Sequence, residues 1–130
     1  MGSFTSYFWL FVGAGIGGAL RHGANRASVA LVGIGFPAGT LFVNLAGCFA
    51  MGVLASLFAF RGEWFTQHSR LFLTTGILGG FTTFSAFSLD AAVIWERGQT
   101  GLASTYVLVS LAGSLVGVFV GLWVGRVIFR

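Results

Sequence analysis

The sequence predicts an all-α membrane protein with four transmembrane helices, and three observations support this. First, 56% of its 130 residues are hydrophobic and only 8% are charged, whereas an average soluble domain is about one quarter charged. Second, the mean hydropathy is +0.93, and the apolar residues form four runs of roughly the 20 residues that cross a bilayer. Third, 21 glycines favour close helix packing, and the residue alternation of a β-barrel is lacking.

The four runs define one transmembrane domain over residues 1–130. Arginine and tryptophan residues lie near their ends, as interfacial anchors do, so the net charge of +4 is assigned to anchoring and not to binding nucleic acid. The segment from 26 to 37 is predicted to be an interfacial turn. The four predicted spans cover, to a first approximation, residues 4–24, 39–60, 71–95 and 101–125.

The third span has an irregular centre. A glycine pair, Gly79 and Gly80, is followed there by hydroxyl residues alternating with phenylalanines, and glycine is a poor helix former. Non-helical backbone at that depth is tolerated only where it is buried in protein or lines a cavity. We therefore expect the third helix to be broken at the bilayer midplane, with carbonyl groups free to bind a small cation such as Na⁺.

The distribution of arginines gives almost no preference for one orientation. With four spans, one side of the membrane carries four arginines and the other carries three. Because topology follows the asymmetry of basic residues, the chain is expected to insert both ways. Two copies would then form an antiparallel homodimer with a self-complementary interface.

Two patterns occur along the fourth span. Glycines recur every four residues at 113, 117, 121 and 125, so they share one face and form a packing seam. Tyr106, Ser110 and Ser114 have the same spacing on a neighbouring face. These serines either bond to carbonyls of their own helix four residues back or line a polar track.

The second span carries Thr40, Asn44 and Cys48 on one face. Asn44 either joins two helices by hydrogen bonding or donates an N–H group into a polar track. Cys48 lies in an apolar run and cannot form an intrachain disulfide, because it is the only cysteine. We interpret it as a small core residue.

Aromatic and charged residues narrow the chemistry. Phe84 and Phe87 share a face of the third span, where they are either core residues or present their positive ring edges to an anion. Asp90 is the only acid inside a span, whereas a proton-coupled exporter of cations needs an embedded carboxylate. Arg21, at the end of the first span, either draws anions to a pore mouth or anchors the helix.

Three segments together resemble the Fluc/CrcB fluoride channel family. They read G-G-F-T-T-F-S-A-F-S at 79–88, G-T-L-F-V-N-L-A-G at 39–47 and G-I-G-G-A-L-R at 15–21. The resemblance implies a dual-topology antiparallel homodimer in the bacterial inner membrane, with two fluoride pores and a central structural Na⁺. It also implies passive fluoride export that protects the cell.

The same resemblance implies roles for individual residues. Two departures from the family pattern occur: Ala86 replaces a frequent threonine, and Asp90 replaces a common glutamate. The implied pore residues are Phe84, Phe87, Asn44, Tyr106, Ser110 and Ser114, with Thr40, Thr83 and Ser85 as additions; Arg21 is the implied vestibule residue, and the carbonyls of Gly79 and Thr82 are the implied Na⁺ ligands.

We therefore expect a fluoride-selective channel and no enzymatic activity. One alternative is a small multidrug-type exporter, which also has four helices and dual topology, but the first span lacks the carboxylate that such an exporter needs. A non-transporting assembly protein is a second alternative. It would account for the glycine seam but not for the polar stripes.

Overall fold

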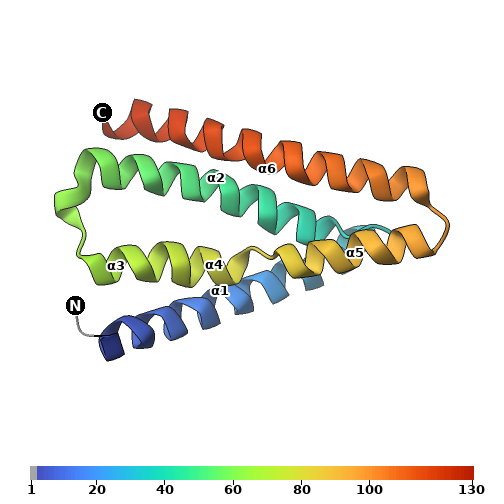
Figure 1. Ribbon diagram of the computed structural model, residues 1–130, viewed down its shortest axis with the longest axis horizontal. Helices are drawn as coiled ribbons and strands as arrows, with labels where there is room; N and C mark the ends of the chain where they lie inside the picture. The colour runs from blue at the N-terminus through green and yellow to red at the C-terminus, as the bar shows by residue number, and fades with distance from the viewer. Residues whose placement is uncertain (1–2) are drawn as a thin grey trace.

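The computed structural model describes residues 3–130, which form four long helical segments that are apolar enough to cross a membrane (Figure 1). Both termini lie at one end of the bundle. The elements are α1 (Ser3–Val32), α2 (Ala38–Arg61), the short 3₁₀ turn η1 (Gly62–Trp64), α3 (Gln67–Leu71), the π-helical η2 (Phe72–Leu78), α4 (Gly79–Phe81), α5 (Phe84–Glu96) and α6 (Thr100–Phe129).

Each predicted span falls within one of these helical segments, but α1 is longer than expected. It continues beyond residue 24 to Val32, so the prediction of a turn beginning at residue 26 was wrong. The helix ends where Gly33 adopts a φ of 80°, a left-handed conformation that commonly terminates helices at glycine. Where the bilayer boundaries fall along each helix stays a prediction.

Helices α2 and α6 lie side by side (Figure 1) along the predicted glycine seam. A Cβ atom at Gly121 would overlap the carbonyl oxygen of Phe49, and one at Gly52 would overlap that of Val118. Ser56 also donates a hydrogen bond to the Leu122 carbonyl, at 2.8 Å. The prediction that the seam serves helix packing is therefore confirmed.

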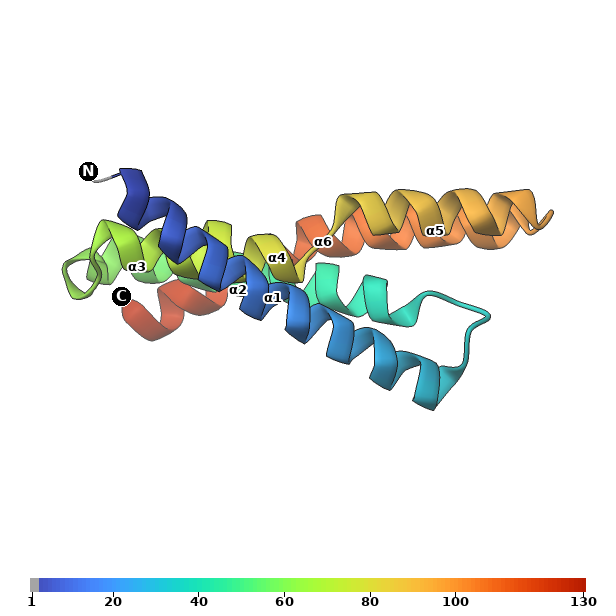
Figure 2. The same cartoon turned by 90° about the horizontal axis from the view of Figure 1, so that it is seen from below.

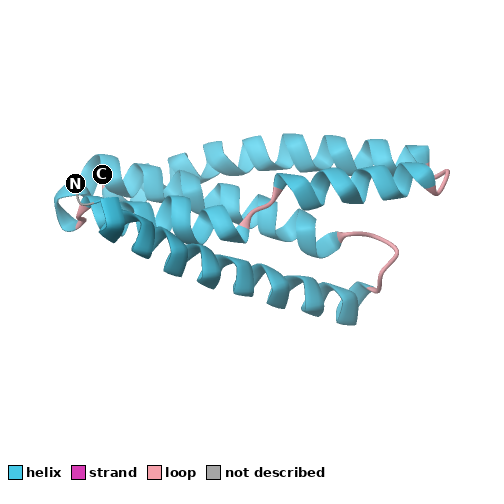
Figure 3. Ribbon diagram, turned by 60° about the horizontal axis from the view of Figure 1, so that its bottom comes forward, coloured by secondary structure: helices cyan, strands magenta, loops and turns pink. Residues whose placement is uncertain are grey.

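The third segment is interrupted after α4, where Thr82 and Thr83 have extended backbones (φ −91°, ψ 158° and φ −154°, ψ 120°). Figure 3 shows this link as a loop in the middle of the molecule. Gly79 and Gly80 themselves are helical, so the expectation of a break at the glycine pair was wrong in position. Gly80 instead permits close packing, because a Cβ there would overlap the Ala14 carbonyl oxygen.

The two halves of the third segment have different neighbours. The part before the interruption, η2 with α4, packs against α1, whereas α5 packs against α6 (Figure 2). At the first contact, a Cβ on Gly17 would overlap the carbonyl oxygen of Ile77. At the second, Phe87 and Ile94 of α5 form a buried cluster with Ala103 and Tyr106 of α6.

Candidate functional site

Asn44 of α2 holds the interruption in place. Its Nδ2 donates to the Thr83 carbonyl at 3.0 Å, and its Oδ1 accepts a hydrogen bond from the Thr83 N–H at 2.8 Å. One amide side chain thus satisfies both backbone groups of a residue outside the helix. The interpretation of Asn44 as a residue that joins two helices is confirmed, and its Nδ2 carries a second N–H for another acceptor.

We term these two hydrogen bonds between Asn44 and Thr83 the clamp. The clamp changes which backbone carbonyl groups lack a hydrogen-bond donor. In an uninterrupted helix the Gly79 carbonyl would accept from the Thr83 N–H, and the Thr82 carbonyl would accept from the Ala86 N–H. The Thr83 N–H bonds to Asn44 instead, and the Ala86 N–H bonds to the Thr83 hydroxyl at 3.1 Å. The Gly79 and Thr82 carbonyls have therefore lost their helical donors.

Arg21 lies beside this interruption. Its Nε donates to the Gly80 carbonyl at 3.1 Å, at the C-terminal end of α4, where a positive charge is favourable. Because α1 continues to Val32, Arg21 does not lie at the end of the first helix, and its interpretation as an interfacial anchor stays a prediction. Its assignment to a vestibule stays a prediction.

A cavity of about 230 Å³, which we term the chamber, lies between α2, α5 and α6 beside the interruption. Six of the residues predicted for the pore line it, although they come from three separate stretches of the chain. Its lining consists of Asn44, Cys48, Thr82, Thr83, Phe84, Phe87, Ser110, Leu111 and Ser114.

Ser110 is a buried chamber residue whose hydroxyl is not used in a hydrogen bond. It is 5% exposed, and its hydroxyl has no hydrogen-bond partner within residues 3–130. Ser104 and Thr105 on the same helix each donate to a carbonyl four residues back, at 2.9 Å. Ser110 does not follow that pattern, and a buried polar group of this kind requires another explanation. A ligand in the chamber would supply its partner.

Phe84 and Phe87 both line the chamber, with ring centroids 5.5 Å apart, but their environments differ. Phe87 is 7% exposed and contacts Tyr106 at 5.3 Å between centroids, whereas Phe84 is 72% exposed. Within this chain Phe87 is therefore a core residue, whereas Phe84 is not.

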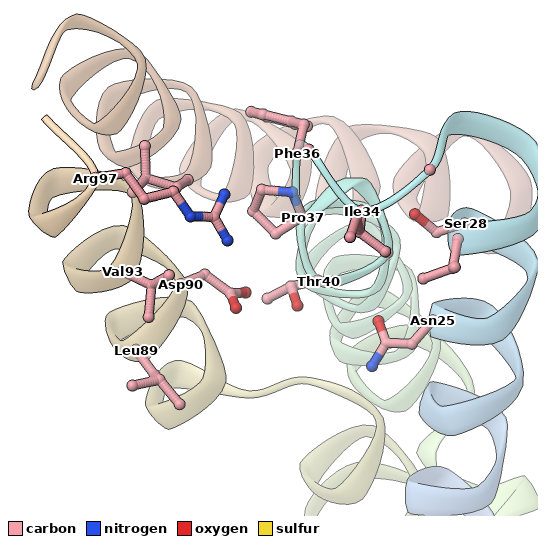
Figure 4. A pocket seen from close by; sticks show the side chains of 15 residues that line it. Asn25, Ser28, Ile34, Phe36, Pro37, Thr40, Leu89, Asp90, Val93 and Arg97 are labelled. Atoms are coloured by element: carbon pink, nitrogen blue, oxygen red, sulfur yellow. The ribbon is translucent and has the colours of Figure 1, made fainter. Parts of the chain in front are cut away.

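Tyr106 and Thr40 lie outside the chamber lining. Tyr106 is fully buried, with its ring against Phe87 and its hydroxyl donating to Asp90 Oδ2 at 3.2 Å. Asp90 and Thr40 line a second cavity of about 310 Å³, where Figure 4 shows their side chains facing one another near Arg97. Tyr106 thus contacts a lining residue of each cavity, Phe87 at the chamber and Asp90 at the second cavity. The hydrogen-bond partner of Asp90 lies 16 residues away, on another helix.

The structure also shows where two further side chains, those of Ser85 and Cys48, lie relative to the chamber. Ser85 lies at the first turn of α5, with its hydroxyl 3.3 Å from that of Thr83, but it is exposed and is not part of the chamber lining. Cys48 is only partly buried and lines the chamber, so its interpretation as a core residue was wrong. Its position four residues after Asn44, on the same face of α2, was the sequence feature that could have indicated this location.

Comparison with known proteins identifies the family of this chain. A family model described as CrcB-like protein, Camphor Resistance (CrcB), matches residues 8–122. A protein of Rhodopseudomonas palustris (strain BisB5) named fluoride-specific ion channel FluC is 51% identical over 123 residues, which cover 95% of this chain and 98% of the relative. Its namesake in Methylobacterium nodulans is 57% identical over 117 residues, covering 90% and 93%. Another in Hyphomonas neptunium is 48% identical over 125 residues, covering 96% and 98%.

The matched region includes the interrupted third segment, the Asn44 clamp and the lining of the chamber. With a family model covering this much of the sequence, and relatives near 50% identity along nearly their whole length, the chain belongs to the CrcB-like protein family.

Proposed function

We propose that this protein is a fluoride-selective channel that exports fluoride passively. The observation that carries the proposal is the buried, unpartnered Ser110 hydroxyl, which lines the chamber together with Phe84 and Phe87. The relatives named fluoride-specific ion channel FluC support it independently.

The chamber suits a small, strongly hydrated anion. Hydroxyl groups and the second N–H of Asn44 can replace water around fluoride, and the positive edges of aromatic rings can approach it. The N-terminus of α5 begins beside the chamber at Phe84, and the positive end of a helix dipole favours an anion. These groups attract fluoride without a positively charged side chain in the chamber lining that would hold it too tightly to leave.

The route continues past Tyr106 into the cavity that Asp90 and Thr40 line. In this proposal Ser114 lines the chamber, and Thr83 and Ser85 lie at its edge. Arg21 attracts anions toward the interruption. The carboxylate of Asp90 would oppose an anion at this end, so in this proposal its hydrogen bond from Tyr106 sets how far it projects into the route.

Passive flow is sufficient for export. Hydrogen fluoride, a weak acid, crosses a membrane uncharged from an acidic exterior and dissociates in the cell, which traps fluoride inside. An inside-negative potential of 100 mV then lowers the free energy of each departing anion by about 2.3 kcal/mol. Export therefore requires no chemical reaction, and the protein is not an enzyme.

Fluoride efflux from liposomes that contain the purified protein tests this function. We expect rapid fluoride release, measured with a fluoride electrode, and little release of chloride under the same gradient. Equal passage of both anions, or no fluoride release, would contradict the proposal. Proton-driven uptake of a cationic dye would instead favour the small multidrug-type exporter, which the lack of acidic residues in α1 already disfavours.

The channel is proposed to be an antiparallel homodimer in the bacterial inner membrane, with the third helix interrupted at the midplane. Two features support a partner. Phe84 lines the chamber while 72% exposed in the single chain. Apart from Arg21, which lies beside the interruption, the predicted spans assign four arginines to one side and two to the other, which is a small asymmetry. Terminal reporter fusions that detect each side of the membrane should reveal both orientations. A single orientation would exclude dual topology.

The proposed Na⁺ site consists of the Gly79 and Thr82 carbonyls from both subunits. These carbonyls lack their helical donors because Asn44 and the Thr83 hydroxyl engage the N–H groups concerned, and oxygen ligands of unwound helices suit Na⁺. Replacing Na⁺ by a large organic cation should lower dimer stability and fluoride flux together. If neither dimer stability nor fluoride flux changes when Na⁺ is replaced, the site is absent.

A further inference from the structure

Cys48 is the only cysteine of the chain, and its side chain lies at the chamber. It is one helical turn beyond Asn44 on α2 and is a free thiol that is only partly buried. A thiol confined to the lipid face or to a packed core would have no access to the ion route. Cys48 shares a cavity with Ser110 and Ser114 of the facing helix.

A second observation marks the same cavity as a place for ligands. The Ser110 hydroxyl, on a residue that is 5% exposed, has no hydrogen-bond partner within residues 3–130. The lining of this space of about 230 Å³ therefore includes both a residue with an unpartnered hydroxyl and a residue with a free thiol. A group attached to the thiol would occupy space that a passing anion needs.

We propose that Cys48 is a binding site for soft metal ions inside the chamber, and that metal binding there closes the pore. The consequence for flux rests on the proposed channel function, whereas the binding itself does not. With mercuric chloride, the sulfur forms a bond to mercury, the S–H proton leaves to water, and one chloride leaves the metal. The product is a cysteine S–Hg–Cl group, and no oxidant or reductant is consumed.

The chemistry of the chamber selects this class of ligand. Thiolate sulfur is a soft ligand that prefers soft metals, whereas the hydroxyl, amide and aromatic groups around it compete poorly for them. Mercuric chloride is small and uncharged, so it can reach a thiol in the middle of a membrane protein from either side. Fluoride, a hard anion, does not compete for the sulfur.

The experiment uses the complete protein in liposomes loaded with fluoride. Efflux is measured before and after mercuric chloride and again after excess dithiothreitol, which removes mercury from the thiol. The intact mass of the same samples reports metal bound per chain. We expect one mercury per chain and a fall in flux of about tenfold or more, since conduction depends on the open diameter of the pore and its lining donors. Dithiothreitol should restore the flux.

Two variants provide the controls, each compared with its own untreated flux. Cys48→Ser should bind no mercury at this position and should be insensitive to the reagent. Phe42→Cys in the Cys48→Ser background places a thiol on the same helix at a residue that is 59% exposed and outside the chamber lining. This thiol should gain the metal without loss of flux.

The possible results separate the two proposals. Absence of a mercury adduct on Cys48, or an adduct that leaves flux unchanged, overturns this inference while the channel function stands. Untreated protein that carries no fluoride contradicts the channel function, and the mass measurement then still decides whether Cys48 binds the metal. Equal inhibition of the Cys48→Ser variant also overturns the inference.

Discussion

The two halves of the third segment are built for different tasks. Before the interruption, η2 and α4 lie directly on the backbone of α1, with Gly13 and Gly17 allowing the contact. After it, α5 contacts α6 through larger side chains, with Phe87 against Tyr106. Glycine contacts bring backbones together and leave no space, whereas residues of α5 line both cavities, with Phe84 and Phe87 at the chamber and Asp90 at the second cavity. The first half positions the interruption, and the second half lines the two cavities.

The largest effect on the free energy of unfolding is expected from Gly17→Ala. The new methyl group would overlap the Ile77 carbonyl and crowd the Phe81 N–H, so we expect a loss of about 3 kcal/mol from overpacking against backbone. Unfolding in mixed micelles with increasing sodium dodecyl sulfate measures it. Gly18→Ala is the matched control, because a Cβ there meets no atom within 4 Å. Similar stability of the two variants would contradict the role of α1 as a fixed support.

Removal of the clamp by Asn44→Leu is expected to destabilise the protein by about 2 kcal/mol or more, because it leaves two backbone groups of Thr83 without partners. The same unfolding assay applies. Ser56→Ala, which removes one interhelical hydrogen bond to Leu122, should cost only about 0.6 kcal/mol. If Asn44→Leu costs no more than Ser56→Ala, the interruption does not depend on the clamp.

A smaller loss, about 1 kcal/mol, is expected for Thr83→Val, which removes the N-cap of α5. The Thr83 hydroxyl accepts from the Ala86 N–H, and valine preserves the shape of the side chain without that acceptor. Thr83→Ser retains the hydroxyl and should retain the stability. A stable Thr83→Val variant would show that α5 begins at this position for another reason.

The smallest effect on stability is expected for Phe84→Ile, below about 0.5 kcal/mol in detergent, because the ring is 72% exposed in the single chain. Its fluoride efflux should nevertheless fall by about tenfold, the factor that roughly 1.4 kcal/mol of lost ring-edge interaction at the barrier would produce. Phe87→Ile, at a ring that is 7% exposed, should lower both stability and flux. Unchanged flux in the Phe84→Ile protein would remove that ring from the ion route.

Several features of the site could be predicted because they depend on spacing along one helix. Glycines every four residues had to share a face of α6, and the structure places two helix backbones in contact there. Asn44 and the Ser110 stripe were identified as polar groups that needed partners inside an apolar segment. Their partners could not be assigned, since a helical pattern states which face a residue occupies but not which helix lies opposite.

The sequence by itself determined four long apolar helices, a polar and irregular centre in the third, and the family resemblance, because these follow from composition and helical period. Only the tertiary structure decided that the interruption falls at Thr82 and Thr83 while the glycine pair stays helical. The physical reason is that backbone groups leave a helix where another partner satisfies them, and that partner, Asn44, is 39 residues away. Tertiary packing likewise decided that Cys48 lies at the chamber and that Arg21 bonds to the Gly80 carbonyl at the end of α4.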